Sequence, residues 1–321
     1  MFAGEANYVP AISLRNSPPV TKMGGGFSMR KSLTYKILAA VMALSAANWA
    51  VPADVSAGYE ENGNYYVTDD YETISNSNDY YNNVYGNGFS FTINDGVIEN
   101  DVYGVGKEGY TEDASGGNVT INGNAEVTDT VYGGRSTDGN AHHNTVNISD
   151  GSVDGSLVDV YGGRSASRTA HHNTVNIRGG SVSSVYGGRS TDGTAHHNTV
   201  NISGGSVTGN VRGGRSNSGA HHNTVNISGG TIGSDQWSVN VYGGYASGSA
   251  KDNQIIIRGS ADITNANLYG RNDSASGTGN TLTIDGWRGS TQSVQNFNDI
   301  AFKNISWNDG GKILILSLIH I

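Results

Sequence analysis

The stretch Ala141-His142-His143-Asn144-Thr145-Val146-Asn147-Ile148 decides the fold, because the same eight residues return at 170–177, 195–202 and 220–227. Weaker copies lie at 118–121, 253–257 and 280–284. Within each copy two aliphatic residues alternate with threonine and asparagine, a period of two that is typical of a half-buried strand. The sequence therefore predicts short strands repeated along the chain.

A second block keeps the same period. Val131-Tyr132-Gly133-Gly134-Arg135-Ser136 returns at 160–165 and 185–190, at 211–216 with Arg212 in place of the tyrosine and, in part, at 241–244. Each unit also carries a short apolar pair such as Ser181-Val182. One unit therefore contains three short strands. Because a single unit cannot bury the aliphatic side chains of these strands, the units must stack on one another. We predict an all-β fold, a parallel right-handed β-helix (β-solenoid) of 25–30-residue coils over residues 84–315.

Stacking of identical coils places identical residues in columns. We expect Asn144, Asn173, Asn198 and Asn223 to form a ladder at a turn, in which each amide bonds the next one. The glycine pairs, such as Gly133-Gly134, are expected at corners with positive φ.

The two ends do not follow the repeat. Residues 29–57 begin with Arg30 and Lys31, continue with an apolar run and end with small residues, which is the secretory signal pattern. Residues 1–28 precede it without any pattern and are interpreted as a misplaced start. Residues 58–83 are expected to form an acidic, tyrosine-rich and poorly ordered leader that shields the first strand edge. The last six residues, 316–321, are interpreted as an adapter-derived artefact.

Composition excludes several classes. The chain of 321 residues has 47 glycines, 4 prolines and no cysteine, which excludes a collagen triplet, a disulfide scaffold and thiol catalysis. The net charge is −9, and the bases of the central repeats recur singly without a continuous basic stripe. Nucleic acid is therefore not an expected partner, and no cofactor is predicted.

The repeats at 144–153 and 173–190, the predicted signal peptide and the absence of cysteine resemble the passenger region of bacterial autotransporters, the type V secretion family. The resemblance implies export by the Sec pathway to the outer-membrane surface or the medium. It also implies a carboxy-terminal β-barrel translocator, which we expect beyond this chain, and a role in adhesion, self-association or surface coating without catalysis. Surface glycans or another copy of the chain are the expected partners.

Three columns of side chains are candidate sites. Imidazoles are ligands for zinc, nickel or copper, although a duplicated unit would also copy them without selection for a site. Arginines suit acidic glycans if they are not simply solvated or interleaved with acids such as Asp138 and Asp192. Tyrosines suit sugars if exposed, and only stabilise the fold if packed. The histidines are His142, His143, His171, His172, His196, His197, His221 and His222; the arginines are Arg135, Arg164, Arg189 and Arg215; the tyrosines are Tyr132, Tyr161, Tyr186, Tyr242 and Tyr269, with Arg212 interrupting.

Two further alternatives stay open. The outward Thr-x-Asn grid that begins at Thr145 and Asn147 is similar to the grids of ice-binding solenoids. A secreted polysaccharide lyase or hydrolase would need residues that break the repeat, as Asp154–Asp159 and Ser234–Trp237 do, but neither break brings paired carboxylates and a base together.

Overall fold

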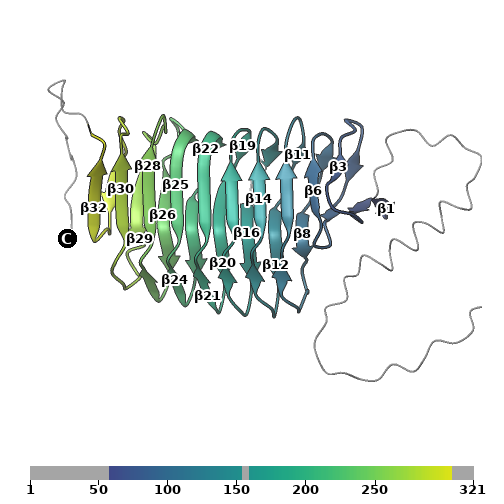
Figure 1. Ribbon diagram of the computed structural model, residues 1–321, viewed down its shortest axis with the longest axis horizontal. Coiled ribbons are helices and arrows are strands. Elements are labelled where there is room, and N and C mark those ends of the chain that lie inside the picture. The colour runs from purple at the N-terminus through teal and green to yellow at the C-terminus, as the bar shows by residue number, and fades with distance from the viewer. Residues whose placement is uncertain (1–57, 154–158, 306–321) are drawn as a thin grey trace, which may run out of the picture. The chain divides into compact units, whose positions relative to one another are not determined.

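The computed structural model describes residues 58–153 and 159–305. These residues form an all-β parallel solenoid of about 7 turns, in which short strands stack along one axis (Figure 1). The predicted fold class is confirmed. The segments interpreted as a misplaced start (1–28), a signal peptide (29–57) and an adapter artefact (316–321) lie outside the described residues, as does most of the break at 154–159.

Three sheets form the sides of the solenoid. Sheet 1 has 11 strands, in the order β1 (Tyr59–Glu61), β2 (Asn64–Tyr66), β5 (Val84–Tyr85), β8 (Val102–Gly106), β12 (Val131–Ser136), β16 (Asp159–Ser165), β20 (Ser184–Ser190), β23 (Val211–Ser216), β26 (Val239–Ala246), β29 (Ala266–Arg271) and β31 (Ser293–Gln295). Sheet 3 has 6 strands, which are β9 (Ala114–Ser115), β13 (Ala141–His142), β17 (Ala170–His171), β21 (Thr194–His196), β24 (Gly219–His221) and β27 (Ser249–Lys251).

Sheet 2 has 15 strands and carries the Thr-Val-Asn-Ile block together with the short apolar pair that follows it. Its strands are β3 (Glu72–Ile74), β4 (Tyr80–Tyr81), β6 (Ser90–Ile93), β7 (Val97–Ile98), β10 (Asn118–Ile121), β11 (Glu126–Val127), β14 (Thr145–Ile148), β15 (Ser152–Val153), β18 (Thr174–Ile177), β19 (Ser181–Val182), β22 (Thr199–Val207), β25 (Thr224–Ile232), β28 (Gln254–Arg258), β30 (Thr281–Asp285) and β32 (Asp299–Lys303).

Identical residues lie in register from coil to coil, as the repeat predicts. Val146 of β14 pairs with Val175 of β18, and Tyr132 of β12 pairs with Tyr161 of β16. The inward valines and isoleucines form one continuous buried core from Val67 to Ile284. Because each coil buries its aliphatic face against the coils on both sides, stacking supplies the core that a single coil lacks.

The asparagine ladder is present and fully buried. The side-chain amide of Asn173 donates to the carbonyl oxygen of the Asn198 side chain at 2.9 Å, and also to the backbone oxygen of Ala141 at 2.9 Å. The same pattern continues through Asn253 to Asn280. Buried polar groups of the turn are therefore satisfied from one coil to the next.

The prediction of positive φ is wrong for Gly133-Gly134 and its copies, although it holds for Gly180, Gly205 and Gly230 in the glycine pairs that follow the Thr-Val-Asn-Ile block. Gly133 and Gly134 lie inside β12 rather than at a corner, and the left-handed glycines of the described chain are others, such as Gly116 and Gly180. A Cβ on Gly133 would lie 2.4 Å from the backbone oxygen of Gly162 in the next coil. A Cβ on Gly134 would lie 2.3 Å from the side-chain nitrogen of Asn144. These glycines are required by close approach, not by positive φ.

The predicted leader, 58–83, is not poorly ordered. It contributes β1 to β4, and β2, β3 and β4 pair with strands of the following coils in sheets 1 and 2. β1 pairs antiparallel with β2 and forms the outermost strand of sheet 1. β1 covers the edge of β2 and is itself exposed along its length.

Candidate functional site

The tyrosine column runs along the outer side of sheet 1. Tyr103, Tyr132, Tyr161 and Tyr186 form their own buried cluster, apart from the aliphatic core. Adjacent rings are stacked, with centroids 5.2 Å apart for Tyr103 and Tyr132 and 4.7 Å apart for Tyr161 and Tyr186. Tyr242 is also buried and stacks on Tyr269 at 4.9 Å. Tyrosine burial fits the packed alternative and leaves little ring surface for stacking on a sugar.

The arginine column covers the tyrosine rings. The guanidinium of Arg164 lies 5.6 Å from the ring centroid of Tyr161 and donates to the hydroxyl of Tyr132 at 3.1 Å. Arg189 donates in the same way to the hydroxyl of Tyr161 at 2.9 Å. Arg135, Arg164 and Arg189 therefore reach back one coil, whereas Arg215 lies 5.6 Å from the ring centroid of Tyr245 in the next coil. Cation–π contact and hydrogen bonding offset the repulsion within the column.

Among the described residues, acids form ion pairs at only one end of this column, although Asp159 accepts a hydrogen bond from the Tyr161 hydroxyl, to which Arg189 also donates. Arg135 lies 3.1 Å from Glu108 and 3.7 Å from Asp101, and within 58–153 and 159–305 no other arginine of the column forms an ion pair. The expected interleaving with Asp138 and Asp192 does not occur: the Asp138 carboxylate instead accepts a hydrogen bond from Ser167.

An arginine and a tyrosine have exchanged columns at Arg212 and Tyr245. Arg212 occupies a tyrosine position, and Tyr245 occupies the arginine position of the next coil, opposite Arg215. The Arg212 guanidinium donates to the Tyr186 hydroxyl at 2.8 Å and lies 5.0 Å from the ring of Tyr245. The two changes compensate each other, so the mixed arginine–tyrosine surface continues. The sequence identified Arg212 as a break, but it did not identify Tyr245 as its counterpart.

The eight histidines form two parallel columns where sheet 3 turns into sheet 2. The first member of each pair ends a strand of sheet 3 and is half-buried, whereas the second is exposed and left-handed, with φ of 53° to 55°. Rings stack from coil to coil, with 4.9 Å between the centroids of His142 and His171 and 5.1 Å between those of His143 and His172. The second histidines therefore serve as the corner residues that glycine was expected to supply; Gly116 holds this position one coil earlier.

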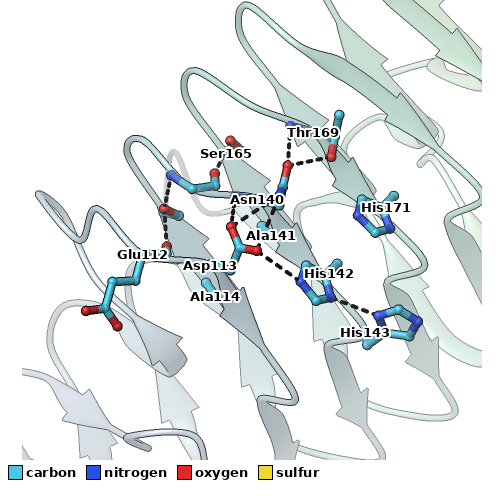
Figure 2. Close-up of polar contacts among 12 residues, drawn as sticks. Glu112, Asp113, Ala114, Asn140, Ala141, His142, His143, Ser165, Thr169 and His171 are labelled. Atoms are coloured by element: carbon cyan, nitrogen blue, oxygen red, sulfur yellow. Dashed lines mark hydrogen bonds and ion pairs between the residues drawn. The ribbon is translucent and has the colours of Figure 1, made fainter. Parts of the chain in front are cut away.

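Within a pair, the Nδ1 atoms face each other. They lie 2.8 Å apart in His142–His143 (Figure 2). They lie 2.9 Å apart in both His171–His172 and His196–His197. Asp113 lies 3.7 Å from Nε2 of His142 and also accepts hydrogen bonds from Asn140. Sequence spacing predicted the columns but not the direction of the ring nitrogens.

Burial and mutual charge disfavour protonation of these rings. Burial, followed by the neighbouring imidazoles, lowers the pKa of His171 to about 4. Burial also lowers the pKa of His172, His196 and His221. His171, His172, His196 and His221 are therefore uncharged at neutral pH, and acid charges them only at a free-energy cost.

We predict that acid destabilises the solenoid through these histidines. The unfolded chain takes up protons below its histidine pKa of 6.5, whereas His171 takes one up only near pH 4, so the free energy of unfolding falls as the pH drops between these values. Thermal unfolding followed by circular dichroism should show a melting temperature roughly 5 °C lower at about pH 4.5 than at about pH 7.

The matched control for this prediction is the double variant His171→Asn, His196→Asn. Carboxylates titrate equally in both proteins, so the variant should lose clearly less stability on acidification than the original chain. Equal losses would show that the histidine columns do not carry the effect.

The Thr-x-Asn grid lies on the outer face of sheet 2, where its residues are half-buried. The amide of Asn176 donates to the Asn147 side chain at 2.9 Å, and Asn201 donates to Asn176 at 2.8 Å. Part of the hydrogen-bonding capacity of this face is thus used along the stack. Ice binding stays a prediction.

Hydrogen bonds hold the break at 234–237, whereas residues 154–158 of the other break lie outside the described residues. Ser234 and Trp237 exchange two backbone hydrogen bonds of 3.1 Å, and Asp235 accepts a bond from Asn265 at 3.2 Å. Across the described ranges, no group of three or more His, Cys, Asp or Glu side chains is placed to hold a metal ion. Nor do these residues contain a helix of the length and apolar character needed to cross a membrane.

No protein-family model matches the chain, and no curated protein or solved structure shows significant similarity to it. Its functional interpretation therefore depends on the repeated surfaces themselves.

Proposed function

We propose that this chain is an exported, non-catalytic surface protein of the autotransporter-passenger type, which acts in adhesion by binding acidic surface polymers along its arginine column. The arrangement of that column carries the proposal. Its positive charges recur in register on successive coils and lie over neutral tyrosines, instead of converging on one point as an active site requires.

The tyrosines contribute indirectly. Burial raises the pKa of Tyr132 and Tyr161, so their hydroxyls remain protonated and do not neutralise the arginines. The hydroxyls accept from Arg164 and Arg189 and fix the direction of both guanidiniums. Fixed cations repeated along one face match a linear polyanion, in which each added contact raises the avidity.

Binding of the full chain to immobilised polygalacturonate should test this function. We expect saturable, salt-sensitive binding without release of unsaturated oligosaccharides. The variant Arg164→Gln, Arg189→Gln should bind at least tenfold more weakly, a difference of about 1.4 kcal/mol. The matched variant Arg164→Lys, Arg189→Lys keeps both charges but loses the stacked guanidiniums, so it should bind more weakly than the original chain and more tightly than the glutamine variant.

Three results would contradict the proposal. Polymer turnover that is lost in Asp235→Asn would indicate an enzyme. Equal binding by the glutamine and lysine variants would exclude the arginine column as the binding surface. Self-association of the chain, seen by light scattering, without any polymer binding would assign the column to contacts between copies.

A further inference from the structure

The histidine pairs combine three features that packing alone does not require. Their exposed members hold a left-handed conformation that glycine adopts more easily. Their rings are nearly perpendicular, at 87° in His142–His143 and 86° in His196–His197. Their Nδ1 atoms, which are lone-pair donors in one neutral tautomer, converge to 2.8–2.9 Å.

We propose that the corners His142–His143, His171–His172 and His196–His197 are binding sites for a tetragonal divalent metal ion, with copper(II) the preferred one. Both Nδ1 atoms of a pair occupy adjacent positions on the ion, and solvent oxygens complete its coordination. The proposal is independent of glycan binding, because the histidines lie in sheet 3 and at its turn into sheet 2, whereas the arginines lie in sheet 1.

The separation of the nitrogens selects the geometry. With metal–nitrogen bonds of about 2.0 Å, two ligands at a right angle lie about 2.8 Å apart, whereas two tetrahedral ligands lie about 3.3 Å apart. The observed 2.8–2.9 Å is the length of the Nδ1–Nδ1 hydrogen bond of the free pair, and a metal ion at a right angle would need almost no change in this separation. Square-planar or tetragonal nitrogen–oxygen sites suit copper(II) and nickel(II), and copper(II) binds more strongly in the divalent series.

The proton balance is simple. In the free pair one Nδ1 carries a proton and donates it to the other Nδ1, so one ring must change tautomer before both can bind the ion. That proton moves to Nε2 of the same ring, and the neutral pair releases no net proton when it replaces waters of the ion. The carboxylate of Asp113, 3.7 Å from Nε2 of His142, favours the tautomer with Nδ1 free (Figure 2).

The surroundings distinguish the fourth pair. Nδ1 of His221 is buried without a hydrogen-bond partner in the described chain. The pair His221–His222 therefore lacks the Nδ1–Nδ1 hydrogen bond that the other three pairs form. Lys251 pairs with His221 in the next strand, and its positive charge opposes a cation there, while Asp252 lies 3.9 Å from Nε2 of His222. We therefore assign the sites to the first three pairs.

The spacing of the pairs limits their occupancy. Rings of neighbouring pairs are 4.9–5.1 Å apart, so ions on adjacent coils repel strongly. The pairs His142–His143 and His196–His197 fill first, with His171–His172 empty between them. About two ions per chain should bind tightly, and any third should bind at least tenfold more weakly.

Copper(II) titration of the full chain at neutral pH tests the sites, with calorimetry for stoichiometry and pulsed electron paramagnetic resonance for the ligands. We expect two tight equivalents and two imidazoles per ion, counted through their remote Nε2 nitrogens. The resonance count uses the unchanged protein, so it tests the proposal whether or not any variant folds.

The variant His143→Gly, His172→Gly, His197→Gly removes one ligand from each site while glycine accepts the left-handed corner. It should lose both tight equivalents. Tyr71→Gly is the matched control, since Tyr71 is also left-handed and exposed but is not a histidine, and it should bind like the original chain. A count of one imidazole per ion, or unchanged binding in the triple variant, would overturn the proposal.

Discussion

Replacing Asn198 with alanine should lower the free energy of unfolding by about 3–5 kcal/mol, the cost of leaving two or more buried polar groups unsatisfied. The Asn198 amide donates to Asn223 and to the backbone oxygen of Ala170, at 3.0 Å and 2.9 Å. Its side-chain oxygen accepts from the backbone and side chain of Asn173, at 3.1 Å and 2.9 Å. The substitution removes all four bonds within the core.

Urea denaturation followed by circular dichroism measures this loss, and Asn201→Ala is the matched control. Asn201 also belongs to an asparagine ladder, in which it donates to Asn176 and accepts from Asn226, both at 2.8 Å, but it lies half-buried on the outer face, where water replaces the lost bonds. It should cost about 1 kcal/mol or less. Equal losses in the two variants would show that burial does not decide the strength of the ladder.

Replacing Gly187 with alanine should cost at least about 4 kcal/mol or prevent folding, because overpacking here involves backbone that cannot move aside. The new Cβ would lie 2.4 Å from the backbone oxygen of Gly213, on the neighbouring coil. Strand spacing of about 4.8 Å is fixed by the hydrogen bonds of sheet 1, so relief requires the coils to separate.

Gly116→Ala is the comparison that isolates close approach from backbone conformation. Gly116 has a φ of 80° and nothing within 4 Å of its missing Cβ, so alanine should cost only about 1 kcal/mol there. The two variants are compared by the midpoint of chemical denaturation and by the yield of soluble protein. A milder effect at Gly187 than at Gly116 would contradict the close-approach explanation.

Sequence reasoning was most successful where one residue type repeats at a fixed place in the coil. Asn144 and its copies were expected to bond one another at a turn, and they do so because parallel stacking in register brings identical amides together. The sequence prediction is wrong at the amino-terminal end, where residues 58–83 form strands instead of a poorly ordered leader. The strands of this segment do not share the residues of the repeated motif, yet they bury Tyr65, Val67 and Ile74 in the same core.

The repeat by itself determined the solenoid, its coil length, the register of its strands and the existence of asparagine, histidine, arginine and tyrosine columns, because stacked identical coils must align identical residues. Only the tertiary structure decided what each column faces. The path of the backbone within one coil places Tyr161 beneath Arg189, brings Gly187 against the next coil and turns Nδ1 of His171 toward His172. The repeat in the sequence determines which residues are neighbours along the stack. The directions of the side chains around a coil depend on the backbone conformation at its corners, such as the left-handed histidines. The spacing of residues in the sequence does not specify these conformations.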